Sequence, residues 1–492
     1  MQSRVLAMYK LVSVLLLTIA LSACTSVEKR VQQASPQTVP LQTAETSSTV
    51  SQPLDGIAFE PSVQAWIDAA VQRSATVAIA QSRLQAARAL NRSALGSLLP
   101  ELTANLGAND IRQRSVQTPA TDAADLPVRS QRRQGSLEFR WELDLFGAGR
   151  KRLSAASSEM QASQADVLAA QQAVAAELQQ TLVRHYAATE RLAINAQLLG
   201  VLSRIETLEK ALADSGIRSK SEWLRVRAEA LARRSVAEND ALELEAQTLR
   251  LRALSDSPRE QTQALLQNTS APKSCALAND FALPLASLSA RPDVHAALWR
   301  LRGALNEADA AQLDRLPSIS LTGSSGTNRQ ENSDIFSALT KSFEHGFGVS
   351  ILQKLFAGGR IQASADAATA KAGEQAATYR QMLLLAAEET DFAIASAKQS
   401  SRSAMRLNAA LADSENLQKM AQARFNAGID SRLDASSAER ETLERSLAAI
   451  EGNRDVCIAA INVRRAITQV WRSNSEISTS SKTINPTQRT QQ

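Results

Sequence analysis

Four short stretches of the chain alternate apolar and polar residues, and a long Ala- and Leu-rich stretch follows two of them. The clearest alternation places Leu137, Phe139 and Trp141 on one face, with charged residues between them. A period of two predicts β-strands with one apolar and one polar face. We therefore predict strands at about 100–112, 134–146, 317–326 and 342–356.

The stretches that follow the second and fourth strands have helical periodicity. Residues 150–214 contain no proline and one glycine, and as a helix they would extend roughly 95 Å. Leu198, Ile205 and Leu212 recur every seven residues, which is a coiled-coil spacing. We predict two helical hairpins, 150–254 turning at Gly216 and 360–470 turning at Gly428, and shorter helices at 61–98 and 292–314.

The chain also contains an internal repeat. Leu145-Phe146-Gly147-Ala148-Gly149-Arg150 returns as Leu355-Phe356-Ala357-Gly358-Gly359-Arg360, and each copy links a strand to a long helix. Leu99-Pro100 and Leu316-Pro317 open the strand pairs. A repeat of this length is one fold built from two similar halves, which we place at 61–270 and 271–472.

The four strands have two interpretations. Their apolar face either covers the core of a water-soluble sheet or faces lipid, with the polar face toward a lumen. Charged residues fill one whole face, and no globular core is evident elsewhere, so we favour the second. Four strands cannot close a barrel, which takes about eight, so several chains must share one. A third hypothesis, a structural periplasmic coiled-coil lipoprotein without a pore, explains the heptads but not the strands.

The N-terminal segment predicts export. Residues 1–23 carry Arg4 and Lys10 before an apolar core, which is typical of a signal peptide. Leu21-Ser22-Ala23-Cys24 resembles the lipobox of bacterial lipoproteins, which implies a lipid on Cys24; the alternative is an ordinary signal with a chance cysteine. We interpret residues 24–60 as a lipid-anchored flexible tether and 473–492 as a disordered tail.

Composition and charge narrow the function classes. The chain has 55 basic and 50 acidic residues with no basic run, so nucleic acid is not an expected partner. Its three histidines lack metal-ligand spacing, and no catalytic motif is present, so we expect no enzyme activity, cofactor or metal. Cys275 and Cys457 could form a disulfide after export, although Cys457 also suits a buried free thiol.

Taken in order, these motifs resemble the outer membrane efflux protein family, the TolC-like exit ducts of Gram-negative bacteria. The resemblance covers residues 60–470 and includes Arg291-Pro292-Asp293-Val294 and Arg424-Phe425-Asn426-Ala427-Gly428. It implies a mainly α fold with a small membrane β part, assembled as a homotrimer with a 12-stranded β-barrel and a 12-helix periplasmic tunnel. The lipobox and the Arg-Pro-Asp-Val run resemble the drug-efflux branch.

The resemblance also implies a function. The protein would be the outer-membrane exit duct of a tripartite efflux system that passes small molecules such as drugs. Its partners would be a periplasmic membrane-fusion adaptor protein, an inner-membrane pump reached through that adaptor, and outer-membrane lipid. The alternative is the outer-membrane channel of a type I polypeptide secretion system. Neither the cargo nor the pump can be named from these residues.

Functional residues are carried over from the family onto three sets of positions. The periplasmic tips that dock the adaptor would be Gly216, Ile217, Arg424, Gly428 and Ile429, although the first tip lacks the aromatic residue that the second has in Phe425. Glu222 and Asp434 would form acidic rings at the aperture, or would complement their helix N-termini. Gly149-Arg150 and Gly359-Arg360 would form the strand–helix junctions.

Overall fold

The computed structural model describes residues 57, 59–113, 128–272, 275, 288, 291–329 and 344–467. The predicted signal peptide, Cys24, nearly all of the tether and the tail at 473–492 lie outside the described residues.

The chain divides into two compact units, and each unit takes segments from both halves of the repeat. Among the described residues, the first unit takes those within 84–163 and 297–380, and the second takes those within 57–83, 164–296 and 381–467. The two units therefore do not coincide with the two halves of the sequence repeat.

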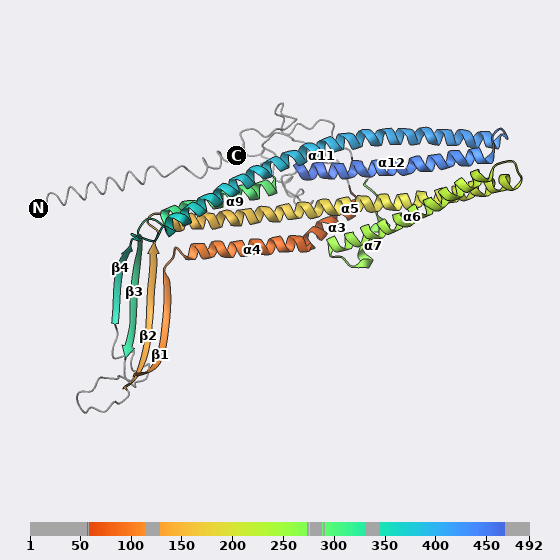
Figure 1. The fold of residues 1–492 in the computed structure, drawn as a ribbon. Helices are drawn as coiled ribbons and strands as arrows, with labels where there is room; N and C mark the ends of the chain where they lie inside the picture. Colours follow the sequence, from red (N-terminus) through yellow and green to blue (C-terminus); the bar gives the residue numbers. More distant parts are fainter. Residues whose placement is uncertain are drawn as a thin grey trace, which may run out of the picture. The chain divides into compact units, whose positions relative to one another are not determined.

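One antiparallel sheet organises the first unit (Figure 1). Its strands are β1 (Glu101–Gln113), β2 (Val128–Leu143), β3 (Ser318–Arg329) and β4 (Glu344–Leu352), in that order across the sheet. β2 pairs with β3, so the halves of the chain meet in the middle of the sheet.

All four predicted strands are present with shifted ends. β2 begins earlier than predicted because its pairing with β1 extends to Gln113 opposite Val128. It ends at Leu143, since Asp144 already begins the turn into the next helix. β4 ends at Leu352, before the predicted 356.

The apolar face of the sheet has no protein cover within the described chain. Leu106 is 81% exposed, Phe347 84% and Val349 69%. All nine residues of β4 are exposed. A water-soluble sheet would bury this face against a core, so the interpretation as a soluble sheet has no support here.

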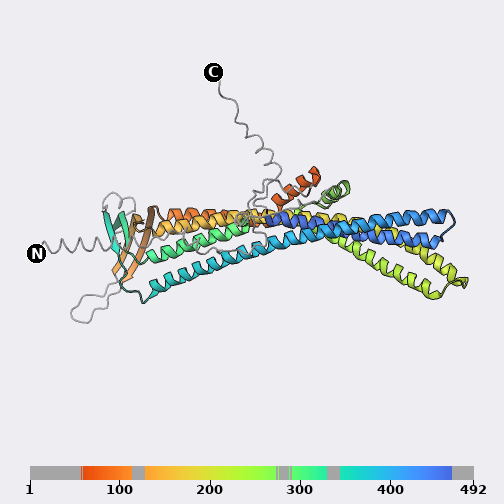
Figure 2. The same ribbon diagram turned by 90° about the horizontal axis from the view of Figure 1, so that it is seen from above.

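The long helices repeat the duplication in their lengths. α5 (Ala148–Asp214) and α11 (Arg360–Asn426) each have 67 residues, and α6 (Lys220–Ser255) and α12 (Arg432–Ile467) each have 36. Figure 2 shows the α5–α6 and α11–α12 hairpins each reversing at a turn of its own. In the described residues no helix is both long and apolar enough to cross a membrane.

Heptad positions supply the core of the second unit. Leu198 and Ile205 on α5 are buried, as their seven-residue spacing predicts. Between α11 and α12 the core is made largely of small residues, which permits close helix contact. Its members are Ala393, Ile394, Ala397, Ala459, Val463, Ala466 and Ile467.

The single helix predicted at 61–98 is wrong. The chain forms α3 (Pro61–Arg73) and α4 (Ala75–Gly96), because the ψ of 130° at Ser74 is extended and breaks the helical path. α3 buries Val63 and Ile67 in a core shared with α5 and α6, which fixes its own direction. The segment after α6 also forms α7 (Arg259–Asn268), which we did not predict, and α9 (Pro292–Leu313) closely matches its predicted range.

Candidate functional site

The two hairpin tips end their first helices with the same motif. Gly216 has φ +74° and Gly428 φ +73°, a left-handed conformation that glycine adopts without strain. The Ile217 amide donates to Leu212 O at 3.0 Å, and the Ile429 amide donates to Arg424 O at 3.0 Å. Together with the glycine amides, these bonds form a Schellman motif at each tip.

Different caps begin the returning helices. Ser431 Oγ accepts from the Asp434 amide at 3.2 Å, and the Asp434 carboxylate accepts from the Ser431 amide at 3.1 Å. This reciprocal pair is a capping box. Ser219 caps α6 alone, accepting from the Ser221 amide, while Glu222 pairs with Arg225 on its own helix. Both acidic residues are therefore first-turn acids, and the capping interpretation of Asp434 has direct geometric support.

Each tip is also braced by an ion pair. Arg424 holds Asp430 across the second turn with bonds of 2.7 and 2.9 Å. These hydrogen bonds lower the pKa of Asp430 below its ordinary value, because they stabilise the charged carboxylate. In the first tip Arg218 donates to the buried Glu209 at 2.6 Å.

The braced turns present apolar side chains to the surroundings. Ile217 is 72% exposed and Ile429 is 67% exposed, each directly after its tip glycine. An isoleucine held on a rigid turn loses little conformational entropy when a partner covers it. Each tip therefore presents an apolar side chain that is suited to binding an apolar surface of a partner.

Ion pairs between the hairpins were missed at the sequence level. Arg440 on α12 donates to both carboxylate oxygens of Glu229 on α6, at 3.1 and 3.0 Å. Arg204 on α5 pairs with Glu439 on α12. The partners of the first pair are 211 positions apart, and no spacing rule connects them, so the sequence carries no signal that could find this pair.

The first strand–helix junction is built around Asp144. Its carboxylate accepts from the Gly149 amide at 3.0 Å and the Arg150 amide at 2.8 Å, and so caps α5. Partial burial alone would raise the pKa of Asp144, but hydrogen bonds from Arg150 and Gly149 outweigh it and lower the pKa. A Cβ on Gly149 would stand 2.5 Å from Leu98 Cδ2, so a larger residue there would require the Leu98 side chain to move.

The second junction has a similar sequence and a different geometry. Gly358 and Gly359 have φ +57° and +81°, whereas the first junction uses a positive φ only at Gly147. Arg360 begins α11 and is exposed. No acid caps α11 as Asp144 caps α5, because Lys354 stands at the position equivalent to Asp144.

The Arg-Pro-Asp-Val run forms an ion cluster around the buried Arg291 in the second unit. Arg291, 8% exposed at its side chain, donates to Asp293 at 2.8 Å and to Glu389 of α11 at 2.7 Å. Arg465 of α12 binds the other oxygen of Glu389 at 2.7 Å. Pro292 begins α9 at the position where a helix tolerates proline. The motif therefore joins α9 to the second hairpin.

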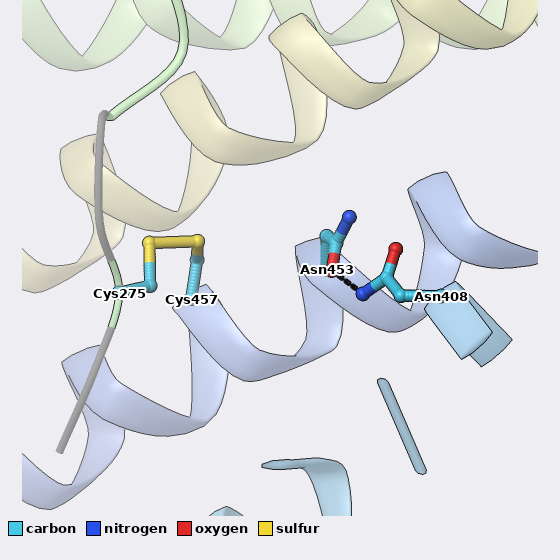
Figure 3. Close-up of a disulfide and its surroundings, with 4 residues drawn as sticks. All are labelled: Cys275, Asn408, Asn453 and Cys457. Atoms are coloured by element: carbon cyan, nitrogen blue, oxygen red, sulfur yellow. Dashed lines mark hydrogen bonds between the residues drawn. A yellow bond between two sulfur atoms is a disulfide. The ribbon is translucent and has the colours of Figure 1, made fainter. Parts of the chain in front are cut away.

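A disulfide joins Cys457 of α12 to Cys275 in the connection between the two halves (Figure 3). The two Cα atoms are 4.8 Å apart, and 182 positions separate the residues. Asn408 of α11 donates to Asn453 of α12 at 2.9 Å one turn along the same helix. In the parts of the chain that the structure describes, no group of three His, Cys, Asp or Glu residues is arranged to hold a metal ion.

Comparisons with known proteins match the chain along most of its length. A family model described as outer membrane efflux protein matches residues 66–256 and 283–469, which are the two halves of the repeat. The chain is 27% identical over 476 residues to outer membrane protein OprJ of Pseudomonas aeruginosa, covering 94% of this chain and 96% of that protein. It is 24% identical over 424 residues to the solvent efflux pump outer membrane protein SrpC of Pseudomonas putida, covering 84% and 86%.

A solved structure shares the fold. The crystal structure of a membrane protein from Pseudomonas aeruginosa superposes with a TM-score of 0.73 at 26% sequence identity, covering 88% of this chain and 98% of that one.

Proposed function

Because the chain belongs to the outer membrane efflux protein family, we propose that it is the exit duct of a tripartite efflux system in the outer membrane. The duct would release small molecules such as drugs that an inner-membrane pump delivers. The observation that carries this proposal is a sheet with an uncovered apolar face, joined by short turns to two long helical hairpins. Such a sheet is suited to lipid, and the hairpins supply a path away from it.

The duct is proposed to be a homotrimer. β1 and β4 are the outer strands of the sheet and lack a partner on one side within the described chain. Unpaired edges are templates for association, and closure into a barrel removes them. Three copies supply twelve strands, which is enough to enclose a lumen.

The hairpin tips are proposed to dock the periplasmic adaptor protein. Support comes from the exposed Ile217 and Ile429 on two rigid turns of the same motif. Glu222 and Asp434 follow each turn by six residues and would form acidic rings in a trimer. Cross-linking a photoreactive residue at position 429 to the adaptor tests the docking; labelling equal to that from an exposed mid-helix position would contradict it.

Two covalent features complete the proposal. A lipid on Cys24 would anchor the chain to the outer membrane, and loss of palmitate labelling in Cys24→Ser tests it. The Cys275–Cys457 disulfide would form in the exported protein, where oxidising conditions favour it. Free-thiol labelling of the purified protein with and without reductant tests the bridge, and full labelling without reductant would contradict it.

Drug susceptibility in a deletion strain tests the efflux function. Deletion of the gene should make the strain sensitive to several unrelated small compounds and raise its retention of a fluorescent dye. Restoring the gene should reverse both effects. The empty vector is the control, and outer-membrane fractions are probed to confirm equal expression of each variant. Unchanged susceptibility together with a changed set of secreted proteins would contradict drug efflux and favour polypeptide secretion.

A further inference from the structure

The two Leu-Phe pairs of the repeat are in different environments. Leu145 and Phe146 are 60% and 43% exposed. They line a cavity of about 540 Å³ in the first unit, together with Leu316 and Pro317 from the start of the other half. Their equivalents Leu355 and Phe356 are 92% and 91% exposed. No other large apolar side chains in the described chain are as exposed as this pair.

The position of each pair in the repeat explains the difference. The Leu-Phe pair of the first half lines the same cavity as the Leu-Pro opening of the second half, because β2 and β3 are neighbours. Among the described residues, nothing covers the Leu-Phe pair of the second half in this way. The Leu-Pro opening of the first half is exposed too, since Leu99 is 58% exposed against 36% for its equivalent Leu316.

We propose that Leu355 and Phe356 of one copy pack against Leu99 and Pro100 of the next copy, repeating between chains the junction that the chain already forms within itself. This inference rests on the proposed trimeric duct and names the residues that lock its subunits together. A second copy is favoured over lipid as the occupant because the charges beside the pair are also complementary.

The same repeat predicts which charged residues face one another beside this contact. Within the chain, Leu143 of β2 pairs with Ile319 of β3. The equivalent residues place Gln353 of one copy opposite Leu102 of the next, and therefore Lys354 opposite Glu101. Neither Lys354 nor Glu101 has an ion-pair partner among the described residues, and both are exposed. An unpaired cation would thus meet an unpaired carboxylate beside the apolar contact.

Thermal dissociation of purified trimers tests this junction. Leu355→Ala with Phe356→Ala should lower the temperature at which trimers dissociate in detergent gels, while the helical circular dichroism of the protein stays unchanged. Lys354→Glu should lower it too, and Lys354→Glu combined with Glu101→Lys should restore at least half of the loss. The reversal depends on a specific pairing, so a general folding defect would not produce it.

The outcomes separate this junction from the duct itself. If the wild-type chain forms no trimer, the proposed duct is wrong. If the wild-type chain forms conducting trimers and both the alanine and charge variants dissociate at the wild-type temperature, the duct stands and the junction is wrong. Failure of the double reversal to restore stability would also overturn the junction.

Discussion

Single residues decide where the helices stop, and most of them could be found in the sequence. Gly216 and Gly428 stood out because a helix interior of this length tolerates few glycines, and both have the positive φ that ends a helix. The sequence did not reveal the capping role of Asp144, because an acidic residue at the end of an alternating strand fits the pattern of the polar, lumen-facing side. Its capping role needs the turn at Gly147 to bring the α5 amides back to the carboxylate.

His185 predicts a pH dependence of stability. It is 8% exposed on α5, beside Thr248 of α6, and burial lowers its pKa below the ordinary value of 6.5. The folded state then binds this proton less readily than the unfolded state, so the free energy of unfolding decreases as the pH falls below about 6.5. Above that pH, His185 does not make the free energy of unfolding depend on pH.

Thermal unfolding at pH 7.5 and pH 5 measures the effect. His185→Phe should reduce the loss of melting temperature between these two pH values, because the substituted side chain binds no proton. Equal losses in wild type and His185→Phe would show that other groups control the acid sensitivity.

At the scale of elements, the sequence predicted each helical hairpin but did not predict the contacts that one hairpin makes with the other. Heptad spacing and the absence of proline predicted α5 and α11 nearly to the residue, since a long helix carries many redundant signals. The break at Ser74 escaped prediction because serine is compatible with a helix and only the core around α3 requires the turn. Contacts between hairpins depend on tertiary geometry that no local pattern encodes.

The Arg440–Glu229 pair predicts a restraint between the hairpins near their tips. We take the closed channel to be the state in which this contact is intact. Each side chain is 34% exposed, so the pair contributes roughly 0.2–1 kcal/mol, which changes the closed population by a few-fold at most per protomer. Arg440→Glu should therefore increase the open fraction of single channels in a lipid bilayer. Arg440→Glu combined with Glu229→Arg should return the channel toward the wild-type behaviour.

A matched control lies on the same helix. Arg445 pairs with Glu441 one turn away on α12, so Arg445→Ala removes an ion pair without affecting the contact between hairpins. If the open fraction of the channel rises equally in Arg445→Ala and Arg440→Glu, the Arg440–Glu229 pair does not restrain the hairpins.

At the scale of the whole molecule, the repeat predicts how copies pair. Trp141 of β2 is opposite Leu321 of β3 inside the chain, and their equivalents are Ile351 of β4 and Ala104 of β1. The two hairpins of the sheet differ by two residues, since Glu101 pairs with Arg140 but Ser318 pairs with Leu352. A shift of two residues between the edge strands of two copies is therefore conceivable, and an experiment has to compare the expected partner of Ile351 with the residues two positions before and after it.

Cysteine cross-linking measures that register. In a background with Cys275→Ser and Cys457→Ser, Ile351→Cys with Ala104→Cys should give the highest yield of covalent oligomers under mild oxidation. Ile351→Cys with Leu102→Cys or Leu106→Cys keeps the same face of the sheet and should give less. A maximum at either of those positions would show that the edge strands of two copies meet in a shifted register.

The pairing of β2 with β3 has a consequence for biosynthesis. The β1–β2 hairpin forms from residues close in sequence, but β3 begins only after the first long hairpin and α9 have been made. Closing a loop of that length costs about 4–5 kcal/mol of chain entropy if the loop is flexible. Until Ser318 leaves the ribosome and is exported, β2 keeps an open edge beside an apolar face. An open strand edge beside an apolar face is an aggregation hazard. Docking of β3 closes the edge of β2, and the outer edges of β1 and β4 stay open until neighbouring copies join.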